Sequence, residues 1–162
     1  MDIAQFRKPL LYPVSSNDKV IVHHNLAYTP DRADYLQTDV YTPSGLSVGQ
    51  RLPGVIFIHG GPLPTGLPLN PKDWGIFQSY GNLVASSGMI GITFNHRFTS
   101  PATLSQADED ITSAIAYVRN HADTFQLDAD RLCMWAFSGG GAFLGPFLYE
   151  KPSFIRCFVA YY

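Results

Sequence analysis

The chain has 162 residues, enough for one domain with a real core, and its 46% hydrophobic and 15% charged content is typical of a folded protein. A net charge of −2, without a basic run interleaved with aromatic residues, argues against nucleic acid or an anionic membrane as partner. No apolar signal core or membrane span is recognisable, and two cysteines without a CxxC pattern or Cys/His cluster fit a reducing setting. We therefore expect a single cytoplasmic domain over 1–162 that binds no metal.

The apolar patterns predict strands that alternate with helices along most of the chain. In chain order, strands are expected at 19–28, 34–43, 55–59, 89–95, 131–137 and 155–162. Helices are expected at 76–87, 105–122 and 140–150, the second with Ser105 as its N-cap. The run VIFIH (55–59) is apolar throughout, as in a parallel strand buried on both faces. The predicted fold class is α/β, a mixed and mostly parallel sheet with helices on both faces.

Cys133 and Cys157 both fall in runs predicted as strands. We expect them to be buried thiols that pack as small hydrophobic groups.

The segment AFSGG (136–140) stands where a buried strand meets a helix. A nucleophilic serine on such a turn needs small residues two positions before and after it, and Ala136 and Gly140 meet this requirement around Ser138. The same turn would bring the amide of Gly139 to a helix N-terminus, where negative charge is stabilised. The alternative is an ordinary small-residue turn, as in many nucleotide-binding folds.

A second glycine-rich loop, HGGP (59–62), also follows a buried strand. Gly60 or Gly61 could offer backbone amides to the oxyanion that Ser138 would generate, and we expect His59 to orient the loop rather than act as base. The alternative is a flexible loop with a packed histidine. Ligands bind beyond the carboxyl ends of parallel strands, so both loops are expected at one site. Neither GxGxxG nor GK[ST] occurs, which argues against nucleotide binding.

At these residues the chain resembles the α/β-hydrolase fold superfamily, in particular the esterase/lipase group and peptidases similar to prolyl oligopeptidases. The resemblance covers roughly 19–162 and rests on HGGP, the helix with Asp110, LDADRLCMWAFSGGG and the order of strands. It implies Ser138 as acyl-forming nucleophile and Gly60, Gly61 and Gly139 as oxyanion hole, with esters, thioesters or peptides as substrates. It implies no cofactor.

The acid and histidine that this family places after the nucleophile have no counterpart here. Residues 139–162 contain neither His nor Asp. His96 follows the strand at 89–95 at the correct edge, but two strands, or roughly 10 Å, should separate it from Ser138. We therefore expect His96 on the surface or, with Phe137, in a substrate pocket, rather than as general base.

The chain is expected to end at the sixth strand of an eight-strand plan, without the last strands and helix. The strand at 155–162 would then be an apolar edge, covered either by further sequence or by a second copy in a homodimer. Two functions remain open. The first is a serine hydrolase acting on a small-molecule carboxylic ester through an acyl-enzyme at Ser138. The alternative is a non-catalytic hydrolase-fold binding module or an inactive fragment.

Overall fold

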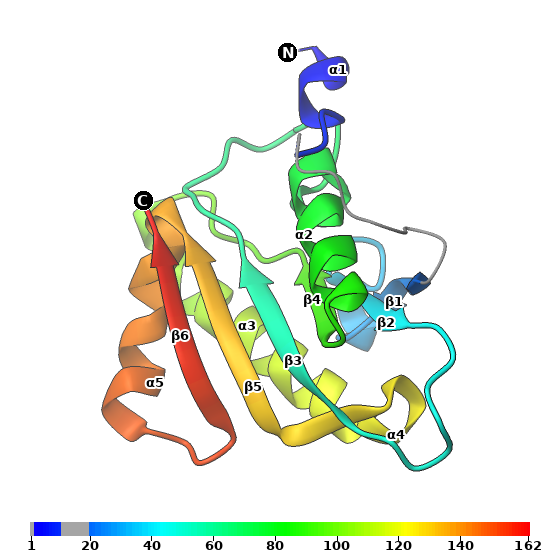
Figure 1. Cartoon of the computed structure of the whole chain (residues 1–162). Helices are drawn as coiled ribbons and strands as arrows, with labels where there is room; N and C mark the ends of the chain where they lie inside the picture. The colour runs from blue at the N-terminus through cyan, green and yellow to red at the C-terminus, as the bar shows by residue number, and fades with distance from the viewer. Residues whose placement is uncertain (1, 11–19) are drawn as a thin grey trace.

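A computed structural model describes residues 2–10 and 20–162 of the chain. Six strands form one sheet in the order β1-β2-β4-β3-β5-β6 (Figure 1). They are β1 (Val20–Ala27), β2 (Gln37–Pro43), β3 (Leu52–Ile58), β4 (Ile90–Phe94), β5 (Leu127–Phe137) and β6 (Ile155–Tyr161). β2 runs antiparallel to β1 and β4, whereas β4, β3, β5 and β6 are mutually parallel. The predicted mixed, mostly parallel sheet is confirmed.

Helices cover both faces of this sheet, as the sequence predicts, with α2 on one face and α3 and α5 on the other (Figure 1). The helices are α1 (Ile3–Phe6), α2 (Gly75–Ser86), α3 (Leu104–Asn120), α4 (Ala122–Phe125) and α5 (Leu144–Glu150). Short 3₁₀ helices lie between them, namely η2 (Pro30–Arg32), η3 (Pro71–Asp73), η4 (Pro101–Thr103) and η5 (Ser138–Phe143). No helix of the described residues is long and apolar enough to cross a membrane.

Strand β3 is apolar throughout because both of its faces are buried. Ile56 and Ile58 belong to the core cluster on the side of α3, whereas Val55 and Phe57 pack toward α2. Successive side chains of a strand point to opposite faces, so a strand covered on both faces shows no alternation of apolar and polar residues.

The start of α3 differs from the prediction. The helix begins at Leu104 with Thr103 as its N-cap, and Ser105 lies inside the first turn. The difference arises because the 3₁₀ helix η4 leads directly into α3, and the Thr103 hydroxyl accepts a hydrogen bond from the backbone N–H of Ser100 (3.1 Å).

The prediction of two buried thiols is wrong for Cys157, which is exposed, while Cys133 is half-buried. The two residues are register partners on β5 and β6, and both thiols are free. Among the described strands β6 is one of the two edges of the sheet, so its residues have a neighbouring strand on one side only.

Candidate active site

Ser138 directly follows β5 and is exposed at the carboxyl edge of the sheet. Its φ angle of 48° lies in the left-handed region, which residues with a side chain seldom adopt. Such backbone strain is found at functional sites where the surroundings enforce it. The strand-to-helix elbow expected from AFSGG is therefore present, and it carries the hydroxyl out of the core.

The HGGP loop packs against this elbow backbone to backbone. A Cβ atom added to Gly60 would lie 2.9 Å from the carbonyl oxygen of Phe137 and 3.1 Å from Cβ of Ser138. A Cβ on Gly140 would lie 2.6 Å from the carbonyl oxygen of His59. A Cβ on Gly139 would collide with the carbonyl oxygen of Gly61. Only glycine permits these approaches, so the two sequence-distant loops lie in direct contact at the carboxyl edge of the sheet.

A cavity of about 400 Å³ opens beside Ser138. Its wall is mostly apolar and consists of Gly60, Gly61, Pro62, Leu63, Trp74, Ile76, Phe77, Phe137 and Ser138. Phe137 thus lines the same cavity as Ser138. Of the other aromatic residues near the loops, Phe143 is buried in the core at 2% exposure.

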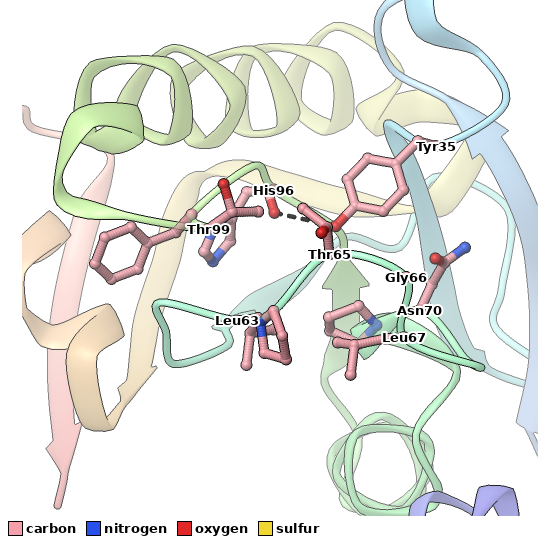
Figure 2. Close-up of a pocket in the computed structure, with 11 residues that line it drawn as sticks. Tyr35, Leu63, Thr65, Gly66, Leu67, Asn70, His96 and Thr99 are labelled. Carbon is pink, nitrogen blue, oxygen red and sulfur yellow. Dashed lines mark hydrogen bonds between the residues drawn. The ribbon is translucent and has the colours of Figure 1, made fainter. Parts of the chain in front are cut away.

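His96 does not line that cavity. It lies in the wall of a second cavity of about 370 Å³, together with Tyr35, Asn70, Phe98 and Thr99 (Figure 2). His96 is only 1% exposed, so the expectation that it lies on the surface is wrong. It is buried because the segment after β4 turns under the HGGP loop, where the imidazole of His96 stacks on that of His59.

The rings of His59 and His96 lie parallel, with centroids 3.5 Å apart and an angle of 3° between their planes. His59 is also buried, and its Nδ1 donates to the carbonyl oxygen of Gly60 (2.7 Å). Its Nε2 accepts from the backbone N–H of His96 (3.3 Å). Burial lowers the pKa of His59 to about 4 and that of His96 well below its ordinary value, so both rings are neutral near pH 7.

The remaining three histidines are engaged away from Ser138. His24 pairs with Asp39 (2.9 Å), and His23 packs edge-on against Phe125. His121 caps α3, and its Nδ1 lies 2.8 Å from the carbonyl oxygen of Tyr117. All five histidines of the chain therefore have other partners, and none forms a hydrogen bond with Ser138 among the described residues.

Comparison with known proteins places this geometry in a family. The model of the BD-FAE family matches residues 38–146, which is more than half of the chain. The chain belongs to the BD-FAE family. The match begins in β2 and ends in α5, so it includes both glycine-rich loops of the site.

Two curated relatives carry esterase or lipase names. Mouse (Mus musculus) carboxylesterase 3B is 23% identical over 134 residues, covering 77% of this chain and 22% of the relative. The bile salt-activated lipase of cattle (Bos taurus) is 28% identical over 120 residues, covering 67% of this chain and 20% of the relative. The BD-FAE chain thus spans about a fifth of the length of these relatives.

Solved structures of esterases share the fold. An inhibited form of esterase B from Lactobacillus rhamnosis has a TM-score of 0.70 at 18% identity, covering 98% of this chain and 52% of that one. Brefeldin A esterase, a bacterial homologue of human hormone-sensitive lipase, has a TM-score of 0.68 at 21% identity, covering 91% and 40%. These likenesses establish the α/β-hydrolase fold for this member of the BD-FAE family.

Two ion-pair clusters that support the site of this BD-FAE chain were missed by the sequence analysis. The side chain of Lys72, just after the loop that lines both cavities, contacts Asp39 (3.0 Å), Asp73 (2.6 Å) and Asn25 (2.7 Å). It is fully buried, and so is Asp39. The charged residue Asp39 within β2 was the available signal, but no spacing rule pairs it with a lysine 33 positions later (72 − 39).

The second cluster holds the segment that carries His96. The guanidinium of Arg97 makes a two-point contact with the buried carboxylate of Asp110 on α3 (2.7 and 2.9 Å), and the backbone N–H of Arg97 donates to the same carboxylate (2.9 Å). A planar guanidinium held at two points fixes orientation as well as distance. The HGGP loop therefore rests on a segment that is itself anchored to α3.

Proposed function

We propose that the protein is a serine hydrolase that cleaves carboxylic esters of small molecules through an acyl-enzyme at Ser138. The observation that carries the proposal is the exposed, left-handed Ser138 held against a glycine loop. The names of the esterase and lipase relatives support the same reaction class. Peptides, the other substrate class that the fold suggests, find no support among these names.

In this reaction Oγ of Ser138 attacks the ester carbonyl carbon and gives its proton to a general base, a role for which the described residues place no histidine in hydrogen-bond contact with Ser138. The carbonyl oxygen becomes an oxyanion, for which the amides of Gly60, Gly61 and Gly139 are the available donors. Collapse expels the alcohol and leaves the acyl group on Ser138, and water then releases the acid. The aromatic wall formed by Trp74 and Phe77 suits an apolar acyl or alkoxy group.

A second candidate is a binding module with the hydrolase fold but without turnover. It is favoured by the five histidines, all of which have partners other than Ser138. In that case the cavity beside Ser138 would bind an apolar ligand without cleaving it.

One experiment separates the two functions. The protein is treated with a fluorophosphonate, and the adduct is located by intact mass and peptide mapping. We expect one adduct on Ser138 that is lost in Ser138→Ala and kept in Ser44→Ala, a control at an exposed serine in the turn after β2. A folded protein without an adduct would contradict the hydrolase and support the binding module.

A further inference from the structure

Two consecutive carbonyl groups of the HGGP loop are held by imidazole N–H groups. Nδ1 of His59 donates to the carbonyl oxygen of Gly60 (2.7 Å), and Nε2 of His96 donates to that of His59 (3.1 Å). The nitrogen that carries the proton on each imidazole ring follows from the hydrogen-bond partners of that ring. Nε2 of His59 must carry a lone pair, because it accepts from a backbone N–H, and a carbonyl oxygen opposite Nε2 of His96 can only accept.

These contacts determine which way the next amides point. The peptide bonds on both sides of Gly60 are trans. In a planar trans peptide, the carbonyl oxygen and the following N–H point in opposite directions. Holding the oxygens of His59 and Gly60 on the imidazole side therefore turns the N–H groups of Gly60 and Gly61 to the other side.

We propose that His96 is a positioning residue: by donating to the His59 carbonyl and stacking on the His59 ring, it aims the amides of Gly60 and Gly61 at the oxyanion. This inference rests on the proposed function, because it gives those two amides a reacting oxygen to bind. His96 itself touches no reacting atom.

The arrangement requires both rings to be neutral. A proton on Nε2 of His59 would face the backbone N–H of His96, which is also a donor. A proton on Nδ1 of His96 would find no acceptor, because this buried nitrogen has no partner among the described residues. Either proton would break the arrangement that holds the two carbonyls.

Among the described residues, the side chains that pack against the ring of His96 are uncharged. Phe94 and Phe143 pack against the ring of His96, at centroid distances of 5.9 and 5.4 Å. The hydroxyl of Tyr35 donates to the carbonyl oxygen of His96 (3.3 Å). The nearby charges of Arg97 and Asp110 are paired with each other.

The test uses nitrogen-15-labelled protein and two variants. In the wild type we expect NMR to show protonated Nδ1 on His59 and protonated Nε2 on His96. In His96→Phe, which can keep an aromatic ring against His59 but loses the donor, we expect the Gly60 and Gly61 amide signals to move. Phosphonylation of Ser138 should slow at least tenfold in this variant. His121→Phe, on the exposed end of α3, is the control and should change neither readout.

The opposite tautomer at His96, or unmoved Gly60 and Gly61 signals in His96→Phe, would overturn the inference. The wild-type tautomers give an answer even if His96→Phe does not fold. If wild-type Ser138 takes no phosphonate, the proposed function fails, whereas the tautomers and amide signals still report whether His96 aims the loop.

Discussion

The ammonium group of Lys72 lies 3.0 Å from Oδ1 of Asp39, and both side chains are fully excluded from solvent. Lys72 follows the loop that lines the two cavities, and Asp39 is the third residue of β2. This ion pair therefore ties the far end of the loop to the sheet, while the imidazole pair holds its beginning.

Breaking this ion pair should destabilise the fold strongly. Lys72→Met removes the buried cation beside Asp39 and leaves its carboxylate, among the described residues, only the contacts with His24 (2.9 Å) and the backbone N–H of Asn25 (2.8 Å), and we expect a loss of about 3 kcal/mol in the free energy of unfolding, measured with urea. Arg51→Met is the matched control, because the Arg51–Asp123 pair is exposed, and it should cost less than about 1 kcal/mol. Equal losses of stability in the two variants would show that the buried ion pair contributes no more to stability than the exposed one.

Acid should weaken the protein before its carboxylates titrate. Burial lowers the pKa of His59 to about 4, so the unfolded chain takes up a proton below about pH 6.5 that the folded protein refuses. Stability is therefore unaffected by this group at neutral pH and falls as the pH drops, by about 3 kcal/mol from His59 alone at pH 4. His96 acts in the same direction.

The check is urea denaturation between pH 7 and pH 5, where most carboxylates stay ionised. The slope of stability against pH should be smaller in His96→Phe, because one proton fewer separates the folded and unfolded states. A wild-type stability that stays flat over this range would mean that the folded protein accepts the protons, contrary to the prediction.

Gly140→Ala should disturb the contact between elbow and loop. The new methyl group would lie 2.6 Å from the carbonyl oxygen of His59 and 3.0 Å from that of Ile58, both backbone atoms that have little room to move. We expect a loss of about 1–3 kcal/mol in thermal or urea unfolding. Gly145→Ala, in α5 with open space around it, should be neutral or slightly stabilising. A harmless Gly140→Ala would mean that the loops are not in tight contact.

Relieving the strain at Ser138 should stabilise the protein while removing the nucleophile. Glycine adopts a φ of 48° without penalty, so Ser138→Gly should be more stable than Ser138→Ala by about 1 kcal/mol. Lys151→Gly offers a matched case outside the site, because Lys151 ends α5 with a φ of 49°. If Lys151→Gly is more stable than Lys151→Ala, but Ser138→Gly is no more stable than Ser138→Ala, the backbone at Ser138 is not strained.

The sequence predicts the sheet, the helices and the meeting of the two loops because each depends on a local pattern. VIFIH has the composition of a doubly covered strand, and AFSGG has the small residues that a sharp elbow requires. The carboxyl ends of parallel strands lie at one edge, so the sequence alone predicts that the two glycine loops lie together.

What the sequence does not predict are contacts between residues that share no pattern. His59 and His96 are 37 positions apart (96 − 59), and only the order β4-β3 of the sheet brings them into a stack. Cys157 lies in an apolar run like that of Cys133, and its exposure follows from the edge position of β6 rather than from its neighbours in sequence. Such features depend on which strand lies beside which.

The close packing of Gly60, Gly139 and Gly140 against carbonyl groups has a consequence for how this protein tolerates mutation. At these glycines the space beside the backbone is already filled by neighbouring carbonyl groups, so any added side chain would clash. A scan of all single substitutions should therefore find its least tolerant positions among residues that contribute no side chain at all. The aromatic wall around Phe77 and Phe137 would accept other bulky apolar residues, and ligand preference could then change there while the frame around Ser138 stays the same.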